Sequence, residues 1–178
     1  MSRLIFFSGG VESTAMLSIA DPQDQLVTVV WKNGWYAPSV DMQKSKKIAQ
    51  EYGFEPMIVS IEFSKPERAE FVHQMDSFVT LGNMLVKAYG FTEVWSGLHS
   101  AEPNPKSKPY HERTLRAWDV LCPEARFVRP LIHLSKKHQW DLIPEHIKPL
   151  VVTCAVHDVF HSGCGKCEER KGLFHDAH

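Results

Sequence analysis

Short apolar runs, separated by longer amphipathic stretches, occupy most of this chain. Such runs lie at residues 4–7, 26–30, 57–61 and 94–95, and a further short strand is expected at 126–129. They are mostly bounded by turn residues, and their shortness is typical of strands that are buried on both faces of a parallel sheet. The pattern therefore predicts five strands at these positions.

The stretches between these runs have the spacing of helices. One helix is expected at residues 14–20, a second from near Pro38 to Gly53, a third at 75–89 and a fourth at about 110–121. The third ends before Gly90, and five apolar residues share its expected buried side: Phe78, Leu81, Leu85, Val86 and Tyr89. A proline-rich loop, 102–109, follows the fourth predicted strand.

This alternation of strands and helices predicts an α/β fold with a doubly wound, mostly parallel sheet and flanking helices. In such folds ligands bind at the carboxyl ends of the strands. From residue 147 onward the periodicity is lost. We therefore expect a nucleotide-binding domain at 1–146 and a small C-terminal module at 147–178 that packs on it as one structural unit.

A glycine-containing loop joins the first predicted strand to the first predicted helix. Glycines let the backbone approach an anion, and the hydroxyls and N–H groups near a helix start donate hydrogen bonds to it. The loop lacks the Walker A lysine and the G-x-G-x-x-G spacing. It fits a phosphate-binding loop, and an ordinary serine- and glycine-rich turn is the alternative. The predicted binding residues are Ser8, Gly9, Gly10, Val11, Glu12, Ser13 and Thr14.

Glu12 is the acidic residue of this loop. A carboxylate beside phosphates repels them unless a cation lies between, so we predict that Glu12 helps to hold Mg²⁺. The alternative is that Glu12 only stabilises the positive end of the helix dipole.

Composition narrows the class of protein. The chain has 178 residues, 43% of them hydrophobic and 23% charged, with a net charge of −1. These values fit a globular domain with a sizeable core and give no reason to expect long nucleic acid as a partner. No apolar run has the length of a membrane span, and no signal peptide is evident at the start. The expected location is the cytoplasm.

The cysteines favour a metal site over disulfides. Three of the four are crowded near the C-terminus, at Cys154, Cys164 and Cys167, whereas Cys122 stands alone and is expected in the core. The C-x-x-C pair turns two thiolates toward one ion, and Cys154 can supply a third. A structural zinc is the prediction, and a redox pair or unused thiols are the alternatives.

A structural zinc site usually has four ligands, so a fourth residue is needed. His157, His161 and His175 are candidates, with Glu168 and Glu169 behind them. His161 is preferred because Ser162 and Gly163 give the backbone freedom to turn its ring toward the thiolates.

Residues 8–13 resemble the S-G-G-x-D-S pyrophosphate loop of the N-type ATP pyrophosphatases, with Glu12 in place of the aspartate. Further segments resemble, in order, those of the QueC family, the 7-cyano-7-deazaguanine synthases. They are Asn83, Trp95-Ser96-Gly97, the run from Pro130 to Trp140 that contains Lys136, the cysteine module, and Lys171-Gly172-Leu173. Four places depart from the family pattern: Glu12, residues 34–37, the segment 109–113, which matches the family's Y-P-D-C-R-like run only loosely, and Arg170 at the position of its fourth cysteine.

The resemblance implies an adenine nucleotide alpha hydrolase-like fold and an ATP-dependent ligase with ATP, Mg²⁺ and Zn²⁺ as cofactors. It would convert 7-carboxy-7-deazaguanine and ammonia to 7-cyano-7-deazaguanine through an adenylated intermediate, in the queuosine pathway. The catalytic residues that it implies are Lys136, Glu12 and Arg113. Lys136 lies next to Lys137 and His138, so a solvated basic helix start is the alternative for it. A homodimer is a further expectation.

Two other functions stay open on the sequence. One is an adenylating enzyme that acts on another acceptor, such as a tRNA base or a protein terminus. The other is a degenerate nucleotide-binding module that acts through partners, which Glu12 and the absent fourth cysteine favour.

Overall fold

The computed structural model describes residues 2–32, 39–62, 74–97 and 108–151. Within them, five strands form one parallel sheet in the order β3-β2-β1-β4-β5. The strands are β1 (Leu4–Phe6), β2 (Gln25–Lys32), β3 (Met57–Glu62), β4 (Glu93–Ser96) and β5 (Arg126–Val128). All five lie where the sequence predicted them.

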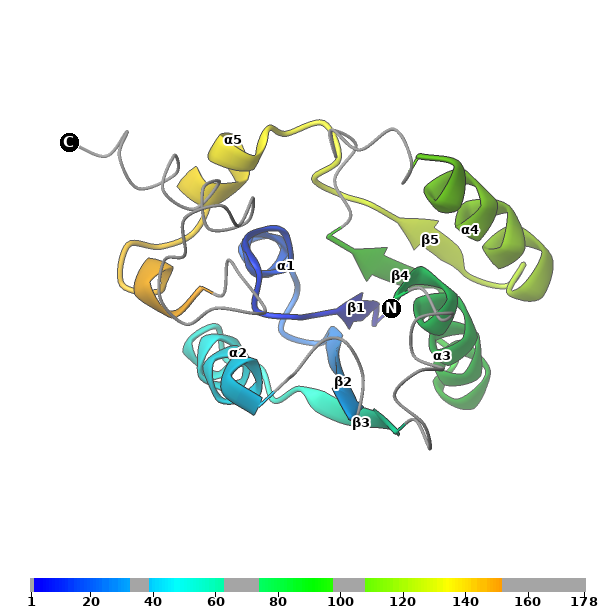
Figure 1. The fold of residues 1–178 in the computed structure, drawn as a ribbon, viewed down its shortest axis with the longest axis horizontal. Coiled ribbons are helices and arrows are strands. Elements are labelled where there is room, and N and C mark those ends of the chain that lie inside the picture. The colour runs from blue at the N-terminus through cyan, green and yellow to red at the C-terminus, as the bar shows by residue number, and fades with distance from the viewer. Residues whose placement is uncertain (1, 33–38, 63–73, 98–107, 152–178) are drawn as a thin grey trace.

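Helices cover both faces of the sheet (Figure 1). One face carries α1 (Val11–Leu17), α2 (Ser39–Glu51), α5 (Lys136–Asp141) and the short 3-10 helix η2 (Lys148–Leu150), and the other carries α3 (Gln74–Tyr89) and α4 (Lys108–Leu121). This arrangement confirms the doubly wound α/β fold. The expected zinc module falls on residues 152–178, outside the described residues.

The strands separate the core into two layers because successive side chains point to opposite faces of a sheet. On β1, Ile5 packs with the apolar side chains of α1, α2 and α5, and Leu4 and Phe6 pack with those of α3 and α4. The Phe6 ring stacks on Phe78 at a centroid distance of 4.4 Å. The central strand β1 thus contributes side chains to both core layers.

The α3–α4 layer shows one correct and one wrong prediction. Cys122 is fully buried, as expected for a core residue. The prediction that Tyr89 lies on the buried side of its helix is wrong, because its side chain is 62% exposed. Tyr89 is the last residue of α3. Its ring contacts Phe91 on one side, and the remainder of the side chain, including the polar hydroxyl, is exposed to water.

The core layer between the sheet and helices α1, α2 and α5 extends to the end of the described chain. Ile147 and Val151 are buried in it, beside Ile143 and Trp140. The domain boundary at residue 146 stays a prediction, because the rest of the C-terminal module lies outside the described residues.

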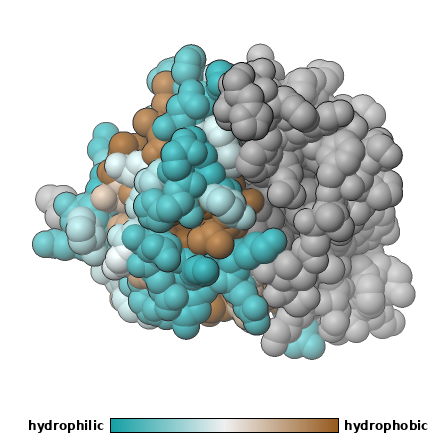
Figure 2. Space-filling model, turned by 90° about the vertical axis from the view of Figure 1, so that its left-hand side faces the viewer, coloured by the Kyte–Doolittle hydropathy of each residue, from teal (hydrophilic) through white to brown (hydrophobic). Residues whose placement is uncertain are grey.

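Seen from the left-hand side of Figure 1, the coloured part of the surface is mostly hydrophilic, with hydrophobic side chains near the centre and toward the upper left of the view (Figure 2). Among the described helices, none has the length and hydropathy needed to cross a membrane.

Candidate functional site

The loop after β1 lies at the point where the strand order of the sheet reverses. From β1 the chain adds β2 and β3 on one side, and later β4 and β5 on the other. Phe6, the last residue of β1, pairs with Ser96, the last residue of β4. In open parallel sheets, ligands bind at the carboxyl ends of the two strands that flank this switch point. The predicted phosphate-binding loop therefore begins where the topology favours a ligand.

Hydrogen bonds within the loop converge on the Ser13 hydroxyl. Its Oγ accepts from Ser8 N at 3.2 Å, lies 3.1 Å from Ser8 Oγ, and donates to the Gly10 carbonyl oxygen at 3.2 Å. Ser13 is only 5% exposed, whereas Ser8 is exposed. In this conformation Ser13 fixes the shape of the loop, and Ser8 presents a hydroxyl at its surface.

Gly9 is held in a conformation that favours glycine, with φ at +76°. A β-carbon at this position would lie 2.4 Å from Ser45 Oγ, on α2. That same hydroxyl donates to the Ser8 carbonyl oxygen at 2.9 Å. Ser45 thus fixes the loop from the neighbouring helix and leaves no space for a side chain at Gly9. Sequence analysis missed Ser45, because a serine within an amphipathic helix carries no signal of such a contact.

The carboxyl end of β4 packs directly on the start of α1. A β-carbon at Gly97 would lie 2.9 Å from Glu12 Cβ and 2.9 Å from Ser13 N. Glycine therefore lets β4 and the loop approach each other closely, which explains why Gly97 ends the Trp95-Ser96-Gly97 segment.

Glu12 and Lys136, two predicted catalytic residues, form an ion pair. Lys136 Nζ lies 3.1 Å from Glu12 Oε1, with side-chain exposures of 19% and 25%. The contact exists because α5 packs on α1, with Trp140 of α5 and Met16 of α1 in the same core. The pair places opposite charges beside the loop, each still accessible to solvent.

The position of Lys136 is fixed by the turn before α5. Ser135 caps the helix by accepting from His138 N at 3.2 Å. The buried Gln139 amide donates to the carbonyl oxygens of Leu131 and Leu134, at 3.0 and 3.2 Å. Lys136 is therefore the first residue of a capped and anchored helix.

Two predicted phosphate ligands are buried below the loop surface. Val11 is 1% exposed and packs in the core, so only its backbone faces the loop. Thr14 is fully buried, and its Oγ1 has no hydrogen-bond partner among the described residues. Their roles as ligands stay predictions, as does that of the Gly10 backbone, which caps α1 without a side-chain hydrogen bond.

Arg113 is not brought together with Glu12 and Lys136. It is exposed on α4, which covers the opposite face of the sheet from α1 and α5. The predicted zinc ligands Cys154, Cys164, Cys167 and His161 lie outside the described residues. Within the described residues, no group of three or more His, Cys, Asp or Glu side chains is arranged to hold a metal ion.

Arg129 is a further residue at the carboxyl edge that sequence analysis did not single out. It follows β5 directly and is partly buried, and burial lowers the pKa of its guanidinium. The sequence could have indicated Arg129 as a candidate, because this charged residue ends the predicted strand at 126–129 and precedes Pro130.

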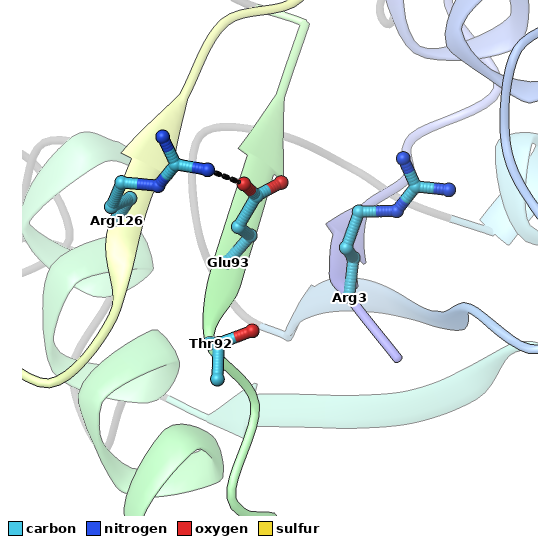
Figure 3. A pocket seen from close by; sticks show the side chains of 4 residues that line it. All are labelled: Arg3, Thr92, Glu93 and Arg126. Carbon is cyan, nitrogen blue, oxygen red and sulfur yellow. Dashed lines mark hydrogen bonds and ion pairs between the residues drawn. The ribbon is translucent and has the colours of Figure 1, made fainter. Parts of the chain in front are cut away.

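A cavity of about 380 Å³ lies at the opposite, amino edge of the sheet, lined by Arg3, Thr92, Glu93 and Arg126 (Figure 3). Its charged groups are engaged with one another or with their neighbours. Arg126 pairs with Glu93, whose other carboxylate oxygen accepts from Trp95 Nε1 at 3.0 Å. The charges that line this cavity are therefore balanced by ion pairs within the protein.

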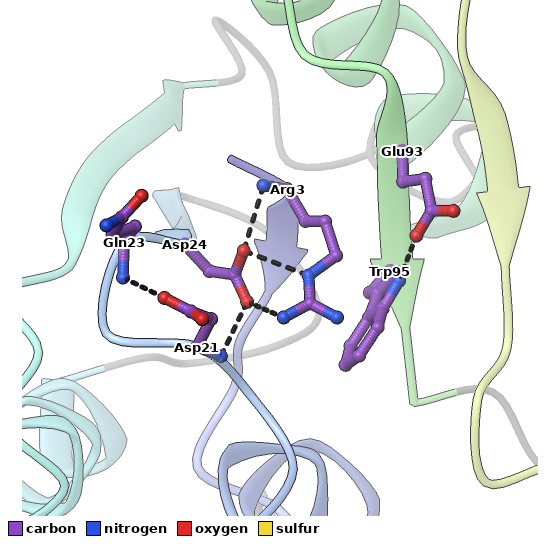
Figure 4. A network of polar contacts seen from close by, with 6 residues as sticks. All are labelled: Arg3, Asp21, Gln23, Asp24, Glu93 and Trp95. Carbon is purple, nitrogen blue, oxygen red and sulfur yellow. Dashed lines mark hydrogen bonds and ion pairs between the residues drawn. The ribbon is translucent and has the colours of Figure 1, made fainter. Parts of the chain in front are cut away.

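Arg3 belongs to the same network (Figure 4). Its backbone N and Nε each donate to Asp24 Oδ1 at 2.9 Å, and its Nη2 lies 2.6 Å from Asp24 Oδ2. The hydrogen bond to Asp24 raises the pKa of Arg3, and the guanidinium lies 4.0 Å from the centre of the Trp95 ring. These contacts join β1, β4 and the turn before β2, so we interpret the amino edge as structural.

No protein-family model and no curated protein matches this chain. The functional argument consequently depends on the residues and their geometry.

Proposed function

We propose that the chain is an ATP-dependent ligase that converts 7-carboxy-7-deazaguanine and ammonia to 7-cyano-7-deazaguanine. The observation that carries the proposal is the loop of residues 8–13 at the switch point of the sheet, with the Glu12–Lys136 pair beside it. A glycine-rich loop at that place suits a polyphosphate, and a lysine beside it suits the charge that develops on a leaving group.

The first step would activate the acceptor. An oxygen of the substrate carboxylate attacks the α-phosphorus of ATP, and the bond from that phosphorus to the bridging oxygen breaks, which releases pyrophosphate. Ammonia then displaces AMP to form the amide. The amide oxygen then attacks the α-phosphorus of a second ATP and releases a second pyrophosphate. This oxygen leaves with AMP, and the amide nitrogen loses its two protons to solvent, which forms the nitrile. Carboxylate oxygen is a poor leaving group, and adenylation makes it a good one.

The residues of the site have distinct roles in this scheme. The backbone of Gly9 and Gly10, with the Ser8 hydroxyl, would bind the phosphates, and Ser13 would keep the loop in shape. Lys136 would stabilise the negative charge on the departing pyrophosphate. Glu12 retains an exposed fraction of 25%, which leaves its carboxylate accessible to a hydrated Mg²⁺.

Mg²⁺ would supply further neutralisation of the phosphates. Three thiolates and an imidazole form a donor set that suits zinc, and the proposed structural zinc would be held by the three C-terminal cysteines and His161. The proposal includes a cytoplasmic location, where such thiolates stay reduced.

The test is the release of pyrophosphate from ATP, measured with and without 7-carboxy-7-deazaguanine. Release that depends on this acceptor supports the ligase. Release without it indicates adenylation of another acceptor, and ATP binding without release in either case indicates a nucleotide-binding module. Lys136→Ala provides the control that ties any release to this site.

A further inference from the structure

Arg129 lies at the same edge of the sheet as the phosphate-binding loop. Val128, the last residue of β5, pairs with Trp95 of β4, so Arg129 follows β5 where Ser96 follows Trp95. Ser96 in turn pairs with Phe6, the residue that ends β1. Arg129 therefore leaves the sheet at the level of the switch point, two strands away from β1.

Within the described part of the chain, Arg129 has no counter-ion. Burial lowers the pKa of its guanidinium, and among the described residues no carboxylate offsets this and none forms an ion pair or side-chain hydrogen bond with it. Two arginines of the amino edge differ in this respect, because Arg3 pairs with Asp24 and Arg126 pairs with Glu93. A guanidinium that is partly removed from water without an anion is costly, and an anionic ligand would offset that cost.

The spacing of strands places Arg129 near the end of β1, where the phosphate-binding loop begins. Neighbouring strands lie about 4.8 Å apart, so the ends of β5 and β1 are separated by about 10 Å. In the order of the sheet, β4 is the one strand between them. In the reaction proposed above, the acceptor's carboxylate must meet the α-phosphate in this region.

We propose that Arg129 is an oxyanion-binding residue of this site, placed for the acceptor's carboxylate or for the phosphate that it attacks. Guanidinium binds either oxyanion through two parallel hydrogen bonds, which a single ammonium group does not reproduce. The identity of the ligands rests on the proposed function. The choice of Arg129 as the residue that binds them rests on its position at the end of β5.

The experiment compares Arg129→Gln with Arg126→Gln, an arginine at the other end of the same strand. Calorimetry first measures the affinity for a non-hydrolysable ATP analogue in the presence of Mg²⁺. A second titration measures the affinity for 7-carboxy-7-deazaguanine in the presence of that analogue. Arg129→Gln should weaken binding of one of these ligands by about tenfold to a hundredfold, the range of a lost charged hydrogen bond. Arg126→Gln should change both affinities by less than about threefold, as expected for a surface position.

The affected ligand identifies the oxyanion. A loss confined to the deazaguanine assigns Arg129 to the acceptor's carboxylate, and a loss confined to the nucleotide assigns it to a phosphate. Arg129→Lys should recover only part of the loss, because lysine keeps the charge without the planar fork. Ligand-free Arg129→Gln should melt no lower than the wild-type protein, since it removes an uncompensated buried charge. Wild-type affinities for both ligands in Arg129→Gln would overturn the inference.

Failure of the proposed function gives a different result. In that case the wild-type protein does not bind 7-carboxy-7-deazaguanine. If it still binds the ATP analogue, the comparison of nucleotide affinities alone decides the inference. If it binds neither ligand, inorganic pyrophosphate serves as the probe in thermal unfolding. A rise in melting temperature that Arg129→Gln abolishes and Arg126→Gln retains still supports an oxyanion site. No rise in the wild-type protein, or the same rise in Arg129→Gln, overturns it.

Discussion

Replacement of Gly9 by alanine tests whether the loop after β1 is as closely constrained as its contacts indicate. The new β-carbon would lie 2.4 Å from Ser45 Oγ and 3.2 Å from the Ser45 Cα. It would also have to adopt the positive φ of +76°. The substitution therefore combines a backbone strain with a steric conflict.

The two contributions differ in size and can be separated. A non-glycine residue in the left-handed region costs about 1–2 kcal/mol. Overpacking against a neighbour costs about 1–3 kcal/mol more. Gly53→Ala is the matched control, because Gly53 has a φ of +81° and nothing within 4 Å of the position of its β-carbon. It should show the first cost alone.

Urea unfolding followed by circular dichroism gives both free energies of unfolding. We expect Gly9→Ala to lose at least about 1 kcal/mol more than Gly53→Ala. Ser45→Ala, which removes the hydrogen bond to the Ser8 carbonyl, should itself cost about 1 kcal/mol. In the double variant the nearest clashing atom is gone, so the combined loss should be smaller than the sum of the single losses by about 1 kcal/mol.

The same variant should affect nucleotide binding. Movement of the loop by a few tenths of an ångström misplaces its N–H donors, so Gly9→Ala should weaken ATP binding by about tenfold, and Gly53→Ala should leave it unchanged. Equal stability losses in the two glycine variants, with additive effects of the Ser45 substitution, would refute the reasoning.

Three further predictions concern other parts of the molecule. Lys136→Ala should lower turnover by about a hundredfold or more, with less than about 1 kcal/mol lost in stability because its pair with Glu12 is partly exposed; a fall below threefold would contradict a catalytic role. Asp24→Asn should cost about 3 kcal/mol in urea unfolding, because it leaves Arg3 without its buried partner; a loss below about 1 kcal/mol would contradict the structural role of the amino edge. Metal analysis of protein purified without chelators should find one zinc per chain, held by the three C-terminal cysteines and His161. Less than about a tenth of an equivalent, or cysteines paired as a disulfide, would refute the zinc site, and a zinc on His157 would refute only the choice of ligand.

The sequence was sufficient to predict the elements of the fold because most of the strands are compact apolar runs. The run at residues 4–7, for example, is buried along its whole length, and such a segment has few alternatives to a central parallel strand. The helix ending at Tyr89 was located correctly, yet Tyr89 itself was placed on the wrong side. Periodicity identifies a helix, but the last residue of a helix often projects beyond the layer that it covers.

The contacts of the candidate site were beyond sequence reasoning for a different reason. Glu12 and Lys136 were each singled out, but their pairing depends on how α5 packs on α1, and no local pattern encodes that. The contact between Gly9 and Ser45 likewise joins a loop to a helix that follows the next strand. Such contacts arise from the strand order, which the sequence did not specify.

The central claim is that this chain makes a nitrile from a carboxylate at the expense of ATP. The most direct measurement incubates the wild-type protein with ATP, Mg²⁺, ammonium and 7-carboxy-7-deazaguanine and analyses the products by mass spectrometry. We expect 7-cyano-7-deazaguanine, with one AMP formed for each of the two activations and the amide as an intermediate. Lys136→Ala should form little of either product. Unchanged carboxylate after many hours with zinc-loaded, folded protein would contradict the account.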